Sequence, residues 1–391
     1  MSGPLAGVRV IDLTINVLGP LATQVLGDAG ADVIKIEAPG GDPMRKLGPC
    51  RTHDMGTYFL NVNRNKRSVL LDLKRPEGKA ALRRLLETAD VFVHSMRIGA
   101  IERLGFGYEA VAALNPRIIY ASATGFRRNS RYRDRGAFDD VVQGLSGIAA
   151  INAGPDGAPR YYPTVIADKF TGYTLASAIS MALYARSNTG KGQQVHVPMM
   201  ETMLAFNLIE HLWGATLRDP SLGLGYSRVT SPHRRPYATK DGYICLMAVT
   251  DDQWRRLYVA IGRPALIEDP RFATLSARSK NIDAVYGVLT EAMTERTTAE
   301  WVTILDEADI VNGPVNTIQD LLDDEYLAET GFFQPVEHPT EGAMTMMAMP
   351  VEFDGTPTSI RSLPPTLGEH TESVLLEAGL SAEEIARARG D

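Results

Sequence analysis

Short apolar runs of strand length alternate with longer segments of helical periodicity through the first half of the chain. The pattern predicts strands at 8–13, 31–37, 68–73, 91–94, 118–122 and 194–197. Between them it predicts helices at 21–26, 76–88, 108–115 and 169–186. Strands and helices that alternate in this way form a mainly parallel sheet covered by helices on both faces, so we expect an α/β fold.

The first strand, helix and strand of this series carry clear boundary residues. Pro20 suits the first turn of the helix, where its missing N–H is not needed, and Gly27 and Gly30 suit the helix exit. Such a unit also opens dinucleotide-binding folds, in which an acid near Glu37 would hold the ribose. The turn has Gly19 followed by proline and lacks the GxGxxG fingerprint, so a structural unit with a solvated Glu37 is the better interpretation and a dinucleotide oxidoreductase the alternative.

The pattern changes after residue 220, where Pro, Ser and Arg crowd together. Beyond this point 241–249 is typical of a strand or hairpin, and 254–261 and 298–306 are typical of amphipathic helices. These elements predict a smaller α/β unit.

The C-terminal part has few helical cues before its end. The stretch 335–365 is rich in Pro and Met, so we expect an extended connection that runs back along the first domain to a short helix at 371–378. We therefore divide the chain into a large domain (1–224), a small domain (225–325) and a C-terminal segment that returns to the large domain (326–391).

Length, composition and charge agree with this division. The 391 residues exceed what one hydrophobic core usually organises, and 44% hydrophobic with 22% charged residues is typical of a globular protein. The net charge of −7 argues against a nucleic-acid partner, since such proteins need an excess of Lys and Arg to neutralise phosphates.

The two cysteines, Cys50 and Cys245, do not form a CxxC pair. We therefore expect a reduced, cytoplasmic protein with no zinc or other metal site. No stretch approaches the roughly 20 apolar residues needed to cross a bilayer, so we expect no membrane association.

Asp168 is a lone carboxylate in the apolar, aromatic run 161–184. Because burying an unpaired charge costs free energy, this acid is expected to be a helix cap, a partner in a buried ion pair or a chemical group. From the residues alone a cap is the leading interpretation, since caps greatly outnumber carboxylates that form covalent intermediates.

Five long segments, in order along the chain, carry a recognisable pattern. They are LGPLATQVLGDAGADVIKIEAPGGDPMR (18–45), NVNRNKRSVLLDLKRPEGK (61–79), ADVFVHSMRIGAIERLGFGYE (89–109), TGKGQQVHVPMMETML (189–204) and PTLGEHTESVLLEAGL (365–380). Together they resemble the class III CoA-transferase family, which includes formyl-CoA, carnitine and bile-acid CoA-transferases and the related α-methylacyl-CoA racemases. The resemblance implies a Rossmann-like large domain, a smaller α/β domain and a homodimer of two interlocked chains. It also implies that coenzyme A is carried as a substrate, that an acyl-CoA and a small carboxylic acid are the reaction partners, and that no metal is needed.

The resemblance implies that Asp168, in the segment PTVIADKFTG (163–172), is the nucleophile. Its carboxylate would attack the donor thioester to give an acyl-aspartyl anhydride and free CoA thiolate. The thiolate would then form an aspartyl-CoA thioester, which the acceptor acid resolves by the reverse sequence. A carboxylate suits this chemistry because it divides one difficult exchange into easier steps.

The resemblance also implies a set of coenzyme A contacts. The matching positions are Leu71, Asp72, Leu73, Lys74, Ser95, Met96, Arg97 and Arg103. The three cations of this set are expected at phosphate oxygens, although each taken alone is also typical of a solvated surface residue. The chain has Ala38 where many members of the family carry Arg, so we expect a replacement contact, with Arg45 as its candidate.

Four further positions are expected to orient the substrate: Asn16, Val17, Phe138 and Asp139. Val17 occupies the position of a glutamine in formyl-CoA transferases, with Asn16 the nearest amide, which argues against oxalate or formate as substrates. Phe138 occupies the position of a histidine in the racemase branch and cannot transfer a proton, which argues against racemisation. An acyl-CoA racemase or epimerase is therefore kept only as the alternative function. Asp139 matches an acidic position of the transferases, and a solvated acid at a helix start is its alternative role.

Two other features separate the chain from the best-known pattern of the family. No glycine-rich loop is found between 231 and 249, where the formyl-CoA transferases carry one. Five arginines crowd the loop 127–135. They are expected either to be solvated or to hold the distal carboxylate of a dicarboxylic acyl group or part of CoA.

Overall fold

The computed structural model describes residues 3–154 and 156–389. These residues form two compact units. The larger unit contains 3–154, 158–207 and 327–389, and the smaller unit contains 208–326. Each unit has a hydrophobic core of its own.

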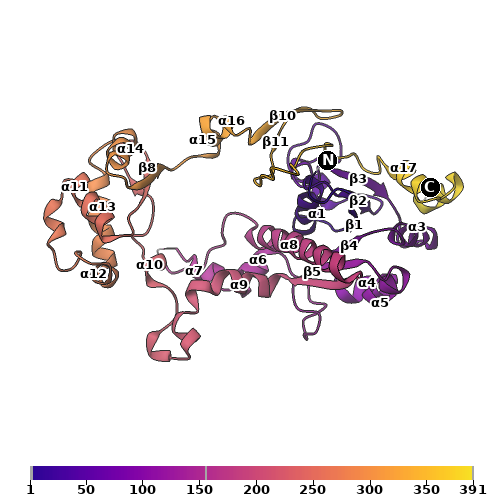
Figure 1. The fold of residues 1–391 in the computed structure, drawn as a ribbon, viewed down its shortest axis with the longest axis horizontal. Helices are drawn as coiled ribbons and strands as arrows, with labels where there is room; N and C mark the ends of the chain where they lie inside the picture. The colour runs from indigo at the N-terminus through magenta and orange to yellow at the C-terminus, as the bar shows by residue number, and fades with distance from the viewer. Residues whose placement is uncertain (1–2, 155, 390–391) are drawn as a thin grey trace. The chain divides into compact units, whose positions relative to one another are not determined.

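The larger unit is built on a six-stranded sheet in the order β3-β2-β1-β4-β5-β6, in which all neighbouring strands are parallel (Figure 1). The strands are β1 (Arg9–Leu13), β2 (Asp32–Glu37), β3 (Lys66–Leu70), β4 (Val91–His94), β5 (Ile119–Thr124) and β6 (Gln193–Pro198). The predicted α/β fold with a parallel sheet is confirmed. The strand order reverses between β1 and β4, and the carboxyl ends at such a switch point are where open α/β sheets bind ligands.

Helices surround this sheet. They are α1 (Leu18–Asp28), α2 (Thr57–Leu60), α3 (Pro76–Leu86), α4 (Ile98–Leu104), α5 (Tyr108–Leu114), α6 (Asp139–Leu145), α7 (Ile148–Ile151), α8 (Ile166–Thr189), α17 (Thr371–Glu377) and α18 (Ala382–Arg389), with the 3₁₀ turn η1 (Pro43–Lys46). The helix α9 (Met199–His211) continues from the larger unit into the smaller one, and α16 (Glu325–Glu329) does so in the other direction.

Side chains that alternate along the strands supply two separate cores, one on each face of the sheet. Val10 and Val33 pack on one face with residues of α1 and α8. Ile11 and Ile34 pack on the other face with residues of α3, α17 and α18. Because these strands are buried on both faces, they appear in the sequence as continuous apolar runs.

The C-terminal part of the larger unit differs from its prediction in one respect. The first part of the stretch 335–365, expected to be an extended connection, belongs to an antiparallel hairpin of β10 (Phe333–His338) and β11 (Gly342–Met347). Proline and the run of methionines hid the alternation that marks strands in a sequence. The chain then does run back along the larger unit, where Asn65 Nδ2 donates a hydrogen bond of 2.8 Å to the Ser359 carbonyl.

The smaller unit packs helices against a three-stranded antiparallel sheet of β7 (Tyr237–Ala238), β8 (Tyr243–Met247) and β9 (Val311–Pro314). Its helices are α10 (Ser227–Thr230), α11 (Asp251–Ala260), α12 (Leu275–Lys280), α13 (Ile282–Met293), α14 (Thr298–Glu307) and α15 (Ile318–Leu322), with 3₁₀ turns η2 (Trp213–Leu217), η3 (Pro220–Leu222) and η4 (Pro264–Ile267). Trp301 is buried at its centre and donates an indole hydrogen bond of 2.8 Å to the Met293 carbonyl.

In both units, the described helices fall short of the length and apolar character needed to cross a membrane.

Candidate active site

Asp168 lies in the first turn of α8. A helix that returns a chain from the carboxyl end of one parallel strand to the start of the next begins at the carboxyl edge of the sheet, so α8 presents Asp168 at that edge. The N-cap of α8 is Val165, which makes no side-chain capping bond. The leading interpretation from the residues alone, that Asp168 caps its own helix, is therefore wrong.

A second carboxylate faces the start of α8. Asp139, in the first turn of α6, is 5% exposed and accepts a hydrogen bond of 3.0 Å from the Asp168 backbone N–H through Oδ1. Its other oxygen, Oδ2, accepts a hydrogen bond of 2.5 Å from Gln143 Nε2. Within the described residues no cation forms a salt bridge with Asp168, so the ion-pair interpretation is wrong as well. Asp139 is not the solvated acid of its alternative interpretation.

These surroundings change the acidity of the site. Burial, with the negative charge of Asp139 second, raises the pKa of Asp168 from 3.8 to about 7. Burial and the charges of Asp168 and Asp139 also raise the pKa of the Tyr58 hydroxyl. The Tyr58 hydroxyl is therefore a neutral phenol at physiological pH, near enough to both acids to respond to their charges. A carboxylate whose pKa lies near neutrality is ionised in a large fraction of molecules and remains a strong base and nucleophile.

Two residues of this arrangement, Tyr58 and Gln143, were not predicted from the sequence. Tyr58 lies on α2, a helix of four residues that is too short to show an apolar period. Gln143 lies four residues after Asp139 on α6, and this i, i+4 spacing of an acid and an amide is the only signal that could have found it.

The positions expected to orient the substrate fall into two groups. Asn16 and Val17 form the turn between β1 and α1, where Asn16 has a φ of 67° and Val17 is buried. This turn lies beside the acid because α8 approaches α1 closely: a Cβ on Gly172 would stand 2.7 Å from the Leu18 carbonyl oxygen. Phe138 precedes Asp139 in the chain and is 70% exposed.

The positions expected to bind coenzyme A follow the carboxyl ends of β3 and β4, most of them in the loops and Arg103 in α4. Leu71 is fully buried, and Leu73 and Met96 pack against the same core, so these side chains are structural. Asp72 Oδ1 accepts a hydrogen bond of 2.9 Å from the Lys74 N–H and shapes its own loop. Ser95 Oγ accepts a hydrogen bond of 3.3 Å from the Ile15 N–H, across the switch point.

The three expected phosphate ligands are exposed but do not form one cluster. Arg97 and Arg103 both lie at α4, where a Cβ on Gly136 would stand 2.8 Å from Arg97 Nη2 and a Cβ on Gly99 would stand 3.2 Å from Arg103 Nη1. Lys74 follows β3, which is three strand positions or about 14 Å from β4. The two arginines therefore share one helix, whereas the lysine belongs to a different loop.

Arg45 and Glu37 correct two expectations. Glu37 is buried and accepts hydrogen bonds of 2.8 Å and 2.7 Å from Arg45 Nε and Nη2, so it is neither solvated nor free for a ribose. Arg45 is fully buried and its guanidinium stacks 3.7 Å from the ring centre of Phe59. It is therefore a structural residue and not the replacement contact for a phosphate.

The arginine loop is partly engaged with its surroundings. Arg127 lies 3.4 Å from Glu201, and Arg133 forms a salt bridge of 2.7 Å with Glu102. Arg131 and Arg135 stack on Tyr132. These contacts fit the solvated, structural interpretation of the loop.

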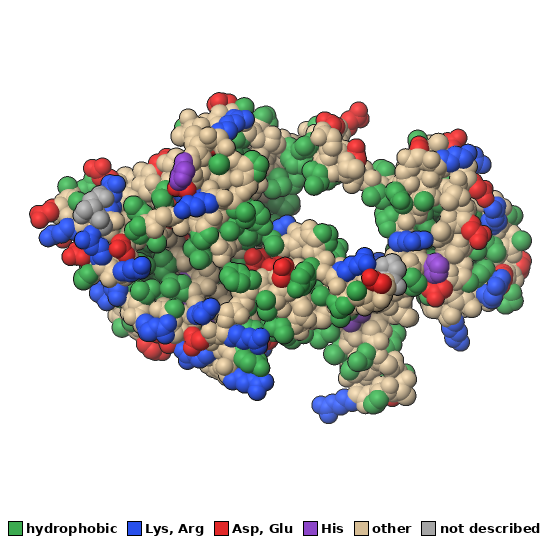
Figure 2. All heavy atoms as spheres, turned by 180° about the vertical axis from the view of Figure 1, so that it is seen from behind, with side chains coloured by type: hydrophobic (Ala, Val, Ile, Leu, Met, Phe, Trp, Pro, Cys, Tyr) green, Lys and Arg blue, Asp and Glu red, His purple; other side chains and the backbone are tan. Residues whose placement is uncertain are grey.

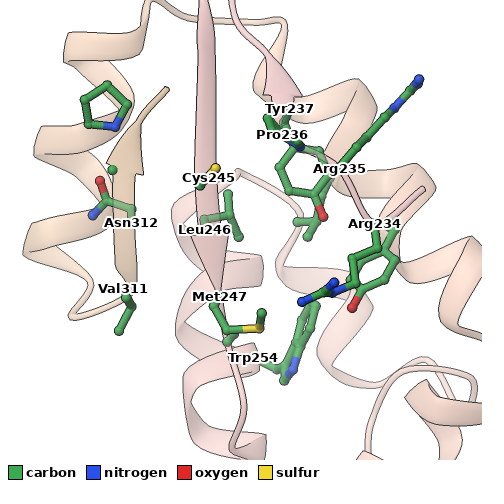
Figure 3. Close-up of a pocket in the computed structure, with 15 residues that line it drawn as sticks. Arg234, Arg235, Pro236, Tyr237, Cys245, Leu246, Met247, Trp254, Val311 and Asn312 are labelled. Carbon is green, nitrogen blue, oxygen red and sulfur yellow. The ribbon is translucent and has the colours of Figure 1, made fainter. Parts of the chain in front are cut away.

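Each unit contains a cavity of its own. A groove of about 850 Å³ in the larger unit is lined by Val17, Tyr58 and Lys169 near the acid and continues along α1 and α8. Figure 2 shows hydrophobic side chains spread over the outer face of this unit. A cavity of about 500 Å³ lies within the smaller unit, where Met247 and Trp254 lie close together (Figure 3). Among the described residues, no group of three or more His, Cys, Asp or Glu side chains is arranged to hold a metal ion.

Comparison with known proteins gives consistent results. A family model described as CoA-transferase family III matches residues 5–371. A succinate–glutarate CoA-transferase of Agrobacterium fabrum is 34% identical, over 96% of this chain and 95% of its own length. A formyl-CoA:oxalate CoA-transferase of Bradyrhizobium is also 34% identical, over 99% of this chain and 96% of its own. The crystal structure of a CAIB/BAIF family protein from Brucella suis superposes with a TM-score of 0.80 at 31% identity, covering 97% of this chain and all of that one.

Proposed function

The chain belongs to CoA-transferase family III, and from this membership we propose that it moves CoA from an acyl-CoA to a carboxylic acid through covalent intermediates on Asp168. The observation that carries the proposal is the arrangement around this residue. A carboxyl group with a pKa of about 7 stands at the carboxyl edge of the sheet, and no cation of residues 3–154 and 156–389 forms a salt bridge with it. A structural acid in a folded protein is normally paired or hydrogen-bonded, so this one is available for chemistry.

The first half-reaction loads the enzyme. An Asp168 oxygen attacks the thioester carbon, a C–O bond forms, and the C–S bond breaks to release CoA thiolate and leave an acyl-aspartyl anhydride. The thiolate then attacks the aspartyl carbon of the anhydride. This step forms the aspartyl-CoA thioester and releases the donor acid as a carboxylate.

The second half-reaction reverses these steps with a different acid. The acceptor carboxylate attacks the aspartyl thioester and displaces the thiolate, which gives a new anhydride. The thiolate attacks the acyl carbon of that anhydride, so the new acyl-CoA leaves and the Asp168 carboxylate is restored. Each tetrahedral intermediate needs a hydrogen-bond donor, and the Tyr58 hydroxyl, whose pKa responds to the charge of Asp168, is the candidate within the described residues.

Coenzyme A would lie over the switch point of the sheet in this proposal. Arg97 and Arg103 are exposed at the start and end of α4 and supply cations for its phosphates. The loops at 71–74 and 95–97 supply backbone groups. We further propose that the large domain carries this binding and that the working form is an interlocked homodimer, as the resemblance implies.

Epimerisation is not favoured as an alternative. The relatives from Agrobacterium fabrum and Bradyrhizobium carry transferase names, and Phe138 offers no proton to a substrate.

The test is to trap the acylated residue. The protein is incubated with acetyl-CoA, butanoyl-CoA or succinyl-CoA and quenched with hydroxylamine, and the modified peptide is identified by mass spectrometry. We expect a hydroxamate on Asp168 and a loss of transfer of at least about 1,000-fold in Asp168→Asn, because the amide cannot form the anhydride.

The matched control is Asp140→Asn, which removes an exposed acid next to Asp139 on the same helix. It should transfer CoA like the native protein. Full activity in Asp168→Asn, or a hydroxamate on another residue, would contradict the mechanism.

A further inference from the structure

Gln143 is a buried amide that the proposed chemistry does not yet use. It is 1% exposed and lies on α6, one turn after Asp139. Residues at this spacing share one face of a helix, so the two side chains meet. A glutamine buried to this extent needs a partner for each of its polar atoms.

Every polar atom of the Gln143 side chain is engaged. Nε2 donates a hydrogen bond of 2.5 Å to Asp139 Oδ2 and a longer one of 3.3 Å to the Thr164 carbonyl. Oε1 accepts a hydrogen bond of 2.8 Å from the Tyr162 N–H. The orientation of the amide is fixed because a rotated amide would turn its oxygen toward two acceptors. Gln143 thus joins α6 to the segment that leads into α8.

The hydrogen bond from Gln143 Nε2 holds Asp139 in place, and Asp139 caps α8, a helix other than its own. The first N–H groups of an α-helix have no partner within that helix, and Val165 offers α8 no side-chain cap. Asp139 Oδ1 accepts the bond from the Asp168 N–H.

The charged and titratable groups around Asp168 come from three helices. Asp139 comes from α6 and Tyr58 from α2. On α8 itself the next residue is Lys169, whose ammonium is engaged with Thr164 Oγ1 at 2.7 Å. The first turn of α1 contributes no charged side chain. The fixed negative charge nearest to Asp168 is therefore that of Asp139.

We propose that Gln143 is a positioning residue for the transfer reaction: its amide fixes the Asp139 carboxylate against the start of α8, so that acylation of Asp168 relieves the repulsion between two carboxylates. This inference rests on the proposed function. Acylation removes the charge of Asp168, whose ionised form is disfavoured by the neighbouring Asp139. A rigid Asp139 thereby favours the acylated enzyme and the thioester over the free carboxylate.

The experiment uses the full-length protein and two readouts. The first is the pH dependence of carbodiimide labelling of Asp168, followed by mass spectrometry, which requires no CoA. The second is the rate at which acetyl-CoA acylates Asp168 at pH 8. The variants are Gln143→Leu, Gln143→Asn and Asp139→Asn. The matched control is Gln24→Leu, because Gln24 is also buried and makes hydrogen bonds of 3.2 Å and 3.1 Å with Asn61 and Arg64.

We expect the labelling midpoint to fall by about one pH unit or more in Asp139→Asn, and to fall in both Gln143 variants, because the neighbouring charge is removed or released. Acylation should slow by about tenfold in the Gln143 variants through lost alignment. Gln24→Leu should leave both the labelling midpoint and the acylation rate of Asp168 unchanged. The shorter amide of Gln143→Asn preserves the polarity of the site if the leucine variant does not fold.

An unchanged labelling midpoint in both Gln143 variants, or an equal change in Gln24→Leu, would overturn the inference. A third outcome separates the two proposals. If the labelling midpoint shifts in the Gln143 variants but no acyl-CoA modifies Asp168 in the native protein, Gln143 positions Asp139 and the proposed function is refuted.

Discussion

At the scale of single residues, the proposed mechanism depends on the raised pKa of Asp168. Burial removes water from the carboxyl group, and Asp139 adds a second negative charge. Both effects disfavour the ionised form in the folded state alone. The same arrangement that prepares a nucleophile therefore has a cost in stability that depends on pH.

This cost predicts the behaviour of Asp168→Asn. The pKa of the carboxyl group is 3.8 in the unfolded chain and about 7 in the folded one. Between these two pH values the unfolded chain binds fewer protons than the folded protein, so the free energy of unfolding falls as the pH rises. This decrease in the free energy of unfolding is complete above pH 7. Asn carries no charge at any pH. We expect the variant to be more stable than the native protein at pH 8, by about 1 to 3 kcal/mol, and the difference to shrink toward pH 4.

Urea unfolding followed by circular dichroism at both pH values measures this difference. Asp140→Asn is the control, since the side chain it changes is exposed. A constant difference between the two pH values would show that the folded pKa is not raised.

At the scale of elements, the close approach of α1 and α8 sets where the acid stands. A Cβ at Gly172 would stand 2.7 Å from the backbone carbonyl oxygen of Leu18. This contact is too short, and it can be relieved only if the backbone of α1 or α8 moves. We therefore expect Gly172→Ala to push the two helices apart, to destabilise the protein by about 1 to 3 kcal/mol and to slow acylation of Asp168. Thermal unfolding and the trapping assay measure the two effects.

Gly287→Ala is the matched control for this change. Gly287 also lies within a helix, α13, and a Cβ there would meet no atom within 4 Å. Alanine should stabilise this helix by up to about 1 kcal/mol and leave acylation unchanged. Equal effects of the two substitutions on stability and acylation would show that Gly172 is not required for the close approach of α1 and α8.

At the scale of the whole molecule, exposed apolar side chains support the proposed homodimer. On α8, Met181 is 68% exposed and Tyr184 is 72% exposed, on a face that the chain does not cover itself. Such surfaces on a globular protein are typical of contacts with another chain. We expect sedimentation equilibrium to give about twice the single-chain mass of 42.6 kDa, and Met181→Glu with Tyr184→Glu to weaken association by at least about tenfold.

Leu376→Glu serves as the control for a new charge on an exposed apolar position, since this residue is 50% exposed on α17. It should leave the mass unchanged. A native protein that sediments as a single chain at micromolar concentration would refute the homodimer.

The local pattern of the sequence was sufficient for the larger sheet. Strands such as β1 and β4 are buried on both faces, so each is a continuous apolar run between turn residues, and the helices between them show their own period. The hairpin of β10 and β11 was not predicted because Pro335 and the methionines conceal its alternation. Asp168 stood out as a charge in an apolar segment before any contact was known.

The sequence by itself determined the alternation of strands and helices, the family and the acid that is exceptional for its surroundings. Only the tertiary structure decided that Asp139 caps α8, that Gln143 bonds to Asp139, that Tyr58 lies within the electrostatic influence of both acids and that Arg45 is paired with Glu37. The reason is physical: a strand or a helix follows from neighbours a few residues apart, whereas a hydrogen bond between two helices, or a pKa set by burial, depends on which distant segments pack together.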